Sequence, residues 1–208
     1  MNRTNREAPL QSVAVYLSEN SRLVFFTVLL LSGAVFGMLV FLVSSPWVSG
    51  ELALILKVRG VPEGFMGGMS GLLSSCMLPL ILLGLLFLVG LSACGAPVIL
   101  LVPLFYGLGL GMTEAYYYST GAAGIGVTAL LILPHSLMAG VSLILAGAES
   151  MRMSLRFSGQ LLPSAPMGGM WQDFKMYCVR FLIYLGLIFG SGVLDVFLRL
   201  GFASLFSL

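Results

Sequence analysis

His135 is the only histidine in this chain of 208 residues, and it follows Pro134 in the middle of a long apolar run. Imidazole titrates near neutral pH, so a histidine at membrane depth is a candidate for proton transfer or substrate binding. The alternative role is structural, with the ring hydrogen-bonded to carbonyl groups that the proline leaves without a donor, or to a Ser or Thr of a neighbouring helix. Metal binding is the least favoured role, because no second His or Cys stands at ligand spacing.

Three carboxylates lie in or beside apolar runs, at Glu114, Glu149 and Asp195. Glu149 follows His135 by 14 residues, nearly four helical turns, so the two would share a helix face without touching. We expect Glu114 at the membrane interface, either solvated or reaching a neighbouring helix, and Asp195 at the outer boundary, where a helix end could pair with it. The candidate structural or functional residues are therefore Pro134, His135, Glu114, Glu149, Asp195, Gly107 and Gly111.

No motif of an enzyme accompanies these residues. The sequence contains no nucleophile elbow of a hydrolase, no Ser/His/Asp set, no HExxH helix and no phosphate loop. The GLGLG segment at residues 107–111 lacks the preceding strand that a dinucleotide-binding turn requires. We therefore expect no catalytic residues, no cofactor and no metal site.

Composition identifies the class of protein. Hydrophobic residues make up 59% of the chain and charged residues only 9%, against about 45–50% and about 25% in soluble domains. Mean hydropathy is +1.06, so much of the apolar surface must face lipid. The net charge of +2 is too small and too scattered for nucleic-acid binding. The sequence predicts an all-α integral membrane protein. Residues 1–208 should form a single membrane domain that contacts the lipid bilayer.

Apolar runs predict five transmembrane helices and a long outer loop over residues 44–75. The fourth run holds 27 apolar residues, too many for one straight span, so we expect this helix to be broken or kinked at Pro134. In the first run, Gly33 and Gly37 form a GxxxG pair, which either lets two helices pack closely or arises by chance in a glycine-rich chain. The expected spans cover residues 23–43, 76–94, 97–112, 122–148 and 176–197.

Basic residues predict the orientation of these spans. Five crossings place the two termini on opposite sides, and a cytoplasmic N-terminus would gather seven of the ten basic residues inside. The inside group is Arg3, Arg6, Arg22, Arg152, Arg156, Lys175 and Arg180, and the outside group is Lys57, Arg59 and Arg199. We therefore expect the N-terminus in the cytoplasm.

Two long segments carry a resemblance to a known family. GLLFLVGLSACGAPVILLVPLFYGLGLG, followed by GAAGIGVTALLILPHSLMAGVSLILAGAESMRMSL, resembles the stage II sporulation protein M family, and the likeness extends to both outer spans. Many broader relatives carry a glutamate four residues after the histidine of the Pro-His pair. This chain has Ala139 at that position, so a metal or acid–base role does not transfer from those relatives.

The resemblance implies a five-span scaffold in the septal or engulfing membrane of a spore-forming bacterium. Members of the family recruit and localise two peptidoglycan-degrading partners, sporulation proteins D and P, and are not themselves hydrolases. For this chain we expect the outer loop, residues 46–75, to supply part of the docking surface. The alternative function is that of a small transporter or permease subunit with a substrate or proton path at His135, and self-association into a homo-oligomer is left open.

Overall fold

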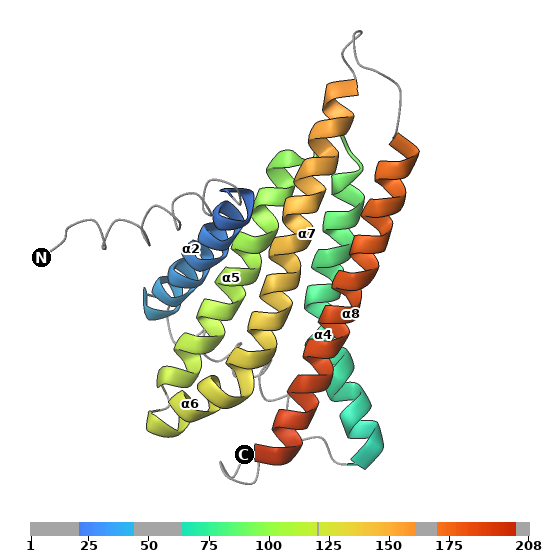
Figure 1. Ribbon diagram of the computed structural model, residues 1–208. Coiled ribbons are helices and arrows are strands. Elements are labelled where there is room, and N and C mark those ends of the chain that lie inside the picture. Colours follow the sequence, from blue (N-terminus) through green and yellow to red (C-terminus); the bar gives the residue numbers. More distant parts are fainter. Residues whose placement is uncertain (1–20, 44–63, 120, 161–169, 203–208) are drawn as a thin grey trace, which may run out of the picture.

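The fold of the described residues is entirely helical. A computed structural model describes residues 21–43, 64–119, 121–160 and 170–202. Figure 1 shows the long helices running alternately in opposite directions, with α2 lying obliquely across the others. The elements are α2 (Ser21–Val43), α4 (Gly64–Gly90), α5 (Ala96–Ser119), α6 (Ala122–Val127), a π-helical turn (Thr128–Ile132), α7 (Leu133–Gln160) and α8 (Met170–Phe202).

Four of these helical segments are long and apolar enough to cross a membrane. They are α2, α5, the segment Gly124–Gly159 and most of α8, and α4 adds a shorter apolar stretch, Ser75–Gly90. Large apolar side chains are exposed along the described helices, as expected for surfaces that contact lipid. The structure therefore agrees with an all-α, membrane-embedded protein.

The predicted outer loop at 44–75 requires correction. Helix α4 begins at Gly64, so residues 64–75 are helical, while residues 44–63 lie outside the described residues. The glycines in this segment suggested a loop, since each costs about 1 kcal/mol relative to alanine in a helix. Tertiary packing outweighs that cost, because Ser75 and Cys76 are buried against α8.

Other helix ends also differ from the expected ones. Helix α4 ends at Gly90, four residues early, and a short turn leads into α5 at Ala96. Helix α5 continues to Ser119 instead of ending at residue 112, and Tyr116 in the added turns contacts Phe41 of α2. A positive φ of 91° at Gly121, which favours glycine, then reverses the chain into α6. Helices α7 and α8 extend beyond the expected spans 122–148 and 176–197, to Gln160 and over Met170–Phe202.

The break expected near Pro134 lies in the turn before it. The π-helical turn Thr128–Ile132 interrupts the α-helix, and α6 leaves the axis of α7 at this point in Figure 1. Proline has no backbone N–H to donate, and its ring clashes with the carbonyl group four residues earlier. A widened turn relieves that clash and allows Pro134 to stand in the first turn of α7, where the missing donor costs least.

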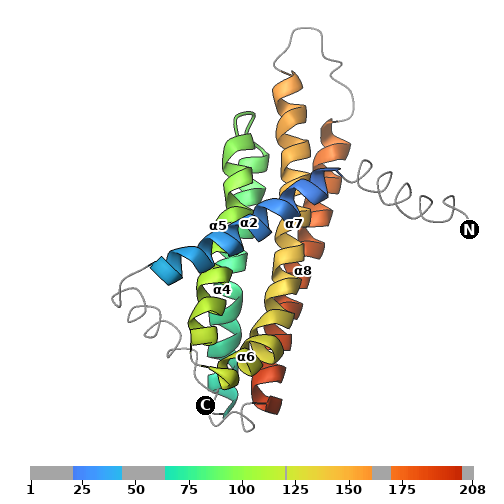
Figure 2. The same cartoon turned by 90° about the vertical axis from the view of Figure 1, so that its left-hand side faces the viewer.

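Figure 2 shows that helix α2 lies obliquely across the bundle. Its contact with α5 is made at glycines of both helices. Gly33 and Gly37 of α2 face Gly107 and Gly111 of α5, and all four are buried. A Cβ atom at any of the four positions would overlap a backbone carbonyl oxygen of the partner helix. The GxxxG pair of the first span is therefore a packing surface rather than a chance pattern.

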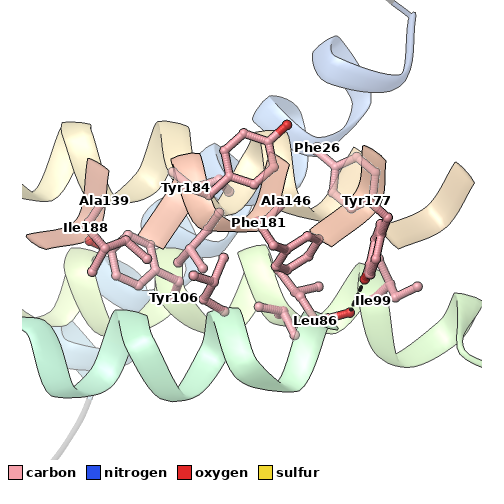
Figure 3. Packing of buried hydrophobic residues seen from close by; sticks show 14 of the residues in the cluster. Phe26, Leu86, Ile99, Tyr106, Ala139, Ala146, Tyr177, Phe181, Tyr184 and Ile188 are labelled. Atoms are coloured by element: carbon pink, nitrogen blue, oxygen red, sulfur yellow. Dashed lines mark hydrogen bonds between the residues drawn. The ribbon is translucent and has the colours of Figure 1, made fainter. Parts of the chain in front are cut away.

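The apolar core lies between α4, α7 and α8, and α2 and α5 add Phe26, Ile99 and Tyr106 to it (Figure 3). Tyr177, Phe181, Tyr184 and Ile188 line one face of α8, and Phe87 of α4 stacks on Tyr177 with ring centroids 5.3 Å apart. The Tyr177 hydroxyl lies within hydrogen-bonding distance of carbonyl oxygens of α4, including that of Phe87 at 3.1 Å. Aromatic contacts and one polar anchor thus join α8 to α4.

We predict that alanine affects the free energy of unfolding differently at two glycines of α5, Gly111 and Gly109. Gly111→Ala should destabilise the protein by about 1–3 kcal/mol, since its Cβ would overlap the backbone of α2. Gly109→Ala is the matched control, because its Cβ would meet no atom within 4 Å, and it should be neutral or stabilise by up to about 1 kcal/mol. Unfolding of the purified proteins in detergent measures both. Equal effects would contradict the glycine crossing.

Candidate functional site

A buried carboxylate of α8 is the centre of the candidate site. Asp195 is 1% exposed and is contacted by side chains of three helices. The Ser75 hydroxyl of α4 donates to its Oδ2, and Arg199 Nε, one turn further along α8, lies 3.0 Å from both carboxylate oxygens. His135 Nδ1 of α7 lies 3.5 Å from Oδ1. Asp195 therefore joins α4, α7 and α8.

The orientation of His135 depends on the break in its own helix. Its Nδ1 lies 3.1 Å from the carbonyl oxygen of Leu131, in the π-helical turn, and the residue is 7% exposed. Both neighbours of Nδ1, this carbonyl and the Asp195 carboxylate, are hydrogen-bond acceptors, so we assign the ring hydrogen to Nδ1. The ring contacts a backbone carbonyl beside the proline, as the structural role requires, and also an acid of another helix.

In a membrane, the spacing of charges along α8 would place Asp195 near one boundary of the hydrocarbon layer. Arg180 and Arg199 are 19 positions apart on α8, about 28 Å along a helix axis, close to the roughly 30 Å hydrocarbon thickness of a bilayer. Asp195 is the only charged residue between these two arginines and lies one turn from Arg199. A carboxylate at this depth needs a counter-charge and hydrogen bonds, which Arg199, Ser75 and His135 supply.

A second charged layer joins α7 to α8 near the other boundary. Glu149 of α7 pairs with Arg180 of α8, and Arg156 of α7 pairs with Asp173 of α8. Along α7, Glu149 is 14 positions from His135, which places the two layers about 21 Å apart. Helices α7 and α8 are therefore linked by polar contacts near both ends of an apolar middle section.

The structure separates the residues that the sequence grouped as candidates. His135 and Asp195 meet directly, whereas Glu149 belongs to the second layer. Glu114 is half-buried near the end of α5 and joins neither layer among the described residues. Gly107 and Gly111 serve the contact with α2.

Sequence reasoning missed two members of the Asp195 cluster. Arg199 could have been found, because an acid followed four residues later by arginine forms a pair on one helix. Ser75 gave no such signal, since it lies 120 residues away in the chain and within a segment expected to be loop.

The cluster links three helices through contacts to one carboxylate. Both oxygens of Asp195 have partners. Neither Asp195 nor His135 lines the apolar groove between α4 and α8 or the two cavities beside Glu149. Among the described residues, no buried side-chain nitrogen or oxygen lacks a partner, and no three His, Cys, Asp or Glu side chains gather as metal ligands would.

An apolar groove of about 350 Å³ lies between α4 and α8. Its lining includes Leu80 and Gly84 of α4 and Leu182 and Leu185 of α8. A Cβ on Gly84 would meet no atom within 4 Å. The free thiol of Cys178 is the one reactive side chain among the described residues that line this groove.

Comparisons with protein-family models, curated proteins and solved structures give no match. The likeness of this chain to the stage II sporulation protein M family therefore rests on its own sequence segments.

We predict that removing the buried negative charge is far more costly than removing an exposed one. Asp195→Asn should destabilise the protein by about 3 kcal/mol, because it leaves the Arg199 guanidinium without its counter-charge. Asp173→Asn is the control, since the side chain is 44% exposed in its pair with Arg156, and it should cost at most about 1 kcal/mol. Unfolding in detergent compares them, and similar losses would show that the Asp195 cluster does not hold the bundle together.

Proposed function

We propose that this chain is a membrane scaffold of a sporulation complex, which recruits and localises peptidoglycan hydrolases like sporulation proteins D and P at the septal membrane. The likeness of its quoted segments to the stage II sporulation protein M family supports this function. The structural observation that carries the proposal is the enclosure of the His135–Asp195 cluster. The titratable groups at membrane depth are engaged between helices, which suits a rigid platform.

Enclosure distinguishes a scaffold from a permease. A proton or substrate path requires its polar groups to reach water or the substrate on at least one side of the membrane. His135 and Asp195 are 7% and 1% exposed, and Ser75, at 6%, covers the carboxylate from α4. These contacts favour a structural role for the cluster and thereby the scaffold.

We infer five membrane crossings with the N-terminus in the cytoplasm. The five long helices alternate in direction (Figure 1), and the distribution of basic residues favours this orientation. The Asp195 cluster and the segment between α2 and α4 then lie toward the outside, where peptidoglycan is found. Residues 44–63 and the start of α4 are the segments that we propose for hydrolase docking.

A small transporter or permease subunit is the second candidate function. The observation that favours it is the His135–Asp195 pair itself, since ionisable groups within membrane helices often mark ion or proton pathways. In that function the cluster would have to open during a transport cycle.

The proposed topology predicts opposite locations for two reporter fusions. A reporter after Leu208 should be active outside the membrane, and one inserted within residues 161–169 should be active in the cytoplasm, because α8 lies between the two sites. Enzymatic reporters specific for each compartment, expressed in a bacterial host, measure this. Activity of both fusions on one side would eliminate the five-crossing arrangement.

The scaffold function predicts which proteins accompany the chain. Tagged chain, captured after crosslinking from membranes of sporulating cells, should enrich peptidoglycan hydrolases over an unrelated tagged membrane protein. His135→Gln keeps a hydrogen-bonding side chain but cannot titrate, so this variant should capture the same hydrolases. Expression of each protein in the membrane is measured in parallel.

Two results would overturn the scaffold proposal. One is enrichment of a nucleotide-binding ATPase without any hydrolase, which would support the permease. The other is loss of sporulation in the His135→Gln strain at normal protein level and with unchanged capture, which would assign a titrating role to the imidazole.

A further inference from the structure

Two adjoining cavities lie at the end of the bundle remote from Asp195. The smaller, of about 200 Å³, lies between α7 and α8 and is lined in part by Arg156, Asp173 and Arg180. The larger, of about 530 Å³, lies where the start of α2 meets α7 and α8. Glu149 and Arg152 line both, so the two cavities share a wall.

The described lining of the larger cavity carries more positive than negative charge. Glu149 is its only acid, and that carboxylate already pairs with Arg180. Arg152 approaches the same oxygen only to 3.8 Å and is 46% exposed. Arg22 is exposed, with no ion pair to any described residue. Among the described residues, the cavity lining therefore carries two arginines against one acid, and Arg180 shares the charge of that acid.

The remaining walls of this cavity are largely apolar. Leu23, Leu145, Ala148 and Tyr184 line it beside the arginines. Glu149, which also lines it, pairs with Arg180 at the level where the spacing along α8 places the edge of the hydrocarbon layer. Positive charge at headgroup depth thus adjoins an apolar wall that continues toward the membrane interior.

We propose that this cavity binds an anionic phospholipid, with Arg22 and Arg152 contacting the headgroup phosphate and the apolar wall contacting the start of an acyl chain. Guanidinium groups suit phosphate because their N–H donors match its oxygens in pairs. Basic pockets between transmembrane helices bind acidic headgroups in this way. The lipid would join α2 to α7, and the inference does not depend on the scaffold function.

Lipid binding to the purified full-length chain tests this proposal. The chain, in neutral detergent, is titrated with phosphatidylglycerol, phosphatidylcholine or sodium phosphate, and bound lipid is counted by native mass spectrometry while thermal unfolding is followed separately. Phosphatidylglycerol should bind at one preferred site and raise the unfolding temperature. Phosphatidylcholine and sodium phosphate should do neither at the same concentration.

Three variants locate the site. Arg22→Gln and Arg152→Gln should each weaken phosphatidylglycerol binding about fivefold. Lys175→Gln is the matched control, because Lys175 lies at the same end of the bundle, faces the Trp171 ring and lines neither cavity. It should bind phosphatidylglycerol like the unaltered chain. Because Arg22 is exposed at the start of α2, its variant should fold normally.

Several outcomes would overturn the proposal. Equal binding of phosphatidylglycerol and phosphatidylcholine would mean that headgroup charge is not recognised. Stabilisation by sodium phosphate as large as that by the lipid would identify a site for the free anion instead. Equal losses in Arg22→Gln and Lys175→Gln would reduce the effect to general attraction between the basic face and an acidic surface.

Discussion

A carboxylate within the membrane must be neutralised by a partner, and in this protein that requirement joins α7 to α8. The Asp195 carboxylate is contacted by Arg199 of its own helix, by His135 of α7 and by Ser75 of α4. About 21 Å away along α7, Glu149 meets Arg180. These two contacts set one register for the antiparallel helices, because sliding either helix by a turn would break the contact between His135 and Asp195 at one level and separate the charges of Glu149 and Arg180 at the other.

The other helices are positioned by contacts that do not rely on apolar burial, which contributes little between helices in lipid. Ser150, Ser154 and Ser158 lie one turn apart on α7, and their hydroxyls donate to carbonyl oxygens at the end of α4 and in the turn after it. These bonds tie α7 to the backbone at the end of α4 and in the turn that follows it. Helix α2 is held instead by close approach of its backbone to α5 at the four glycines.

Much of this arrangement could be predicted from the sequence, because hydropathy, proline chemistry and glycine spacing act locally. They indicated the membrane class and the interruption near Pro134, and they gave close packing at Gly33 and Gly37 as one of two interpretations. The predicted start of α4 was wrong. Its glycines favour a loop by propensity, but packing against α8 makes the segment helical. The contact between His135 and Asp195 depends on which helices are neighbours, which one sequence does not specify.

The sequence also contains a charge pattern that indicates the register of α7 and α8. Glu149 and Arg156 on α7 are seven residues apart, and so are Asp173 and Arg180 on α8, with the signs in the order that antiparallel pairing requires. We conclude that the ion pairs between these two helices fix the register of α7 and α8. A charge exchange tests it most directly, through unfolding in detergent of Glu149→Arg, Arg180→Glu and the double variant. We predict that each single variant is destabilised and that the double variant recovers most of the loss; a double variant as unstable as the sum of the two single variants would contradict the claim.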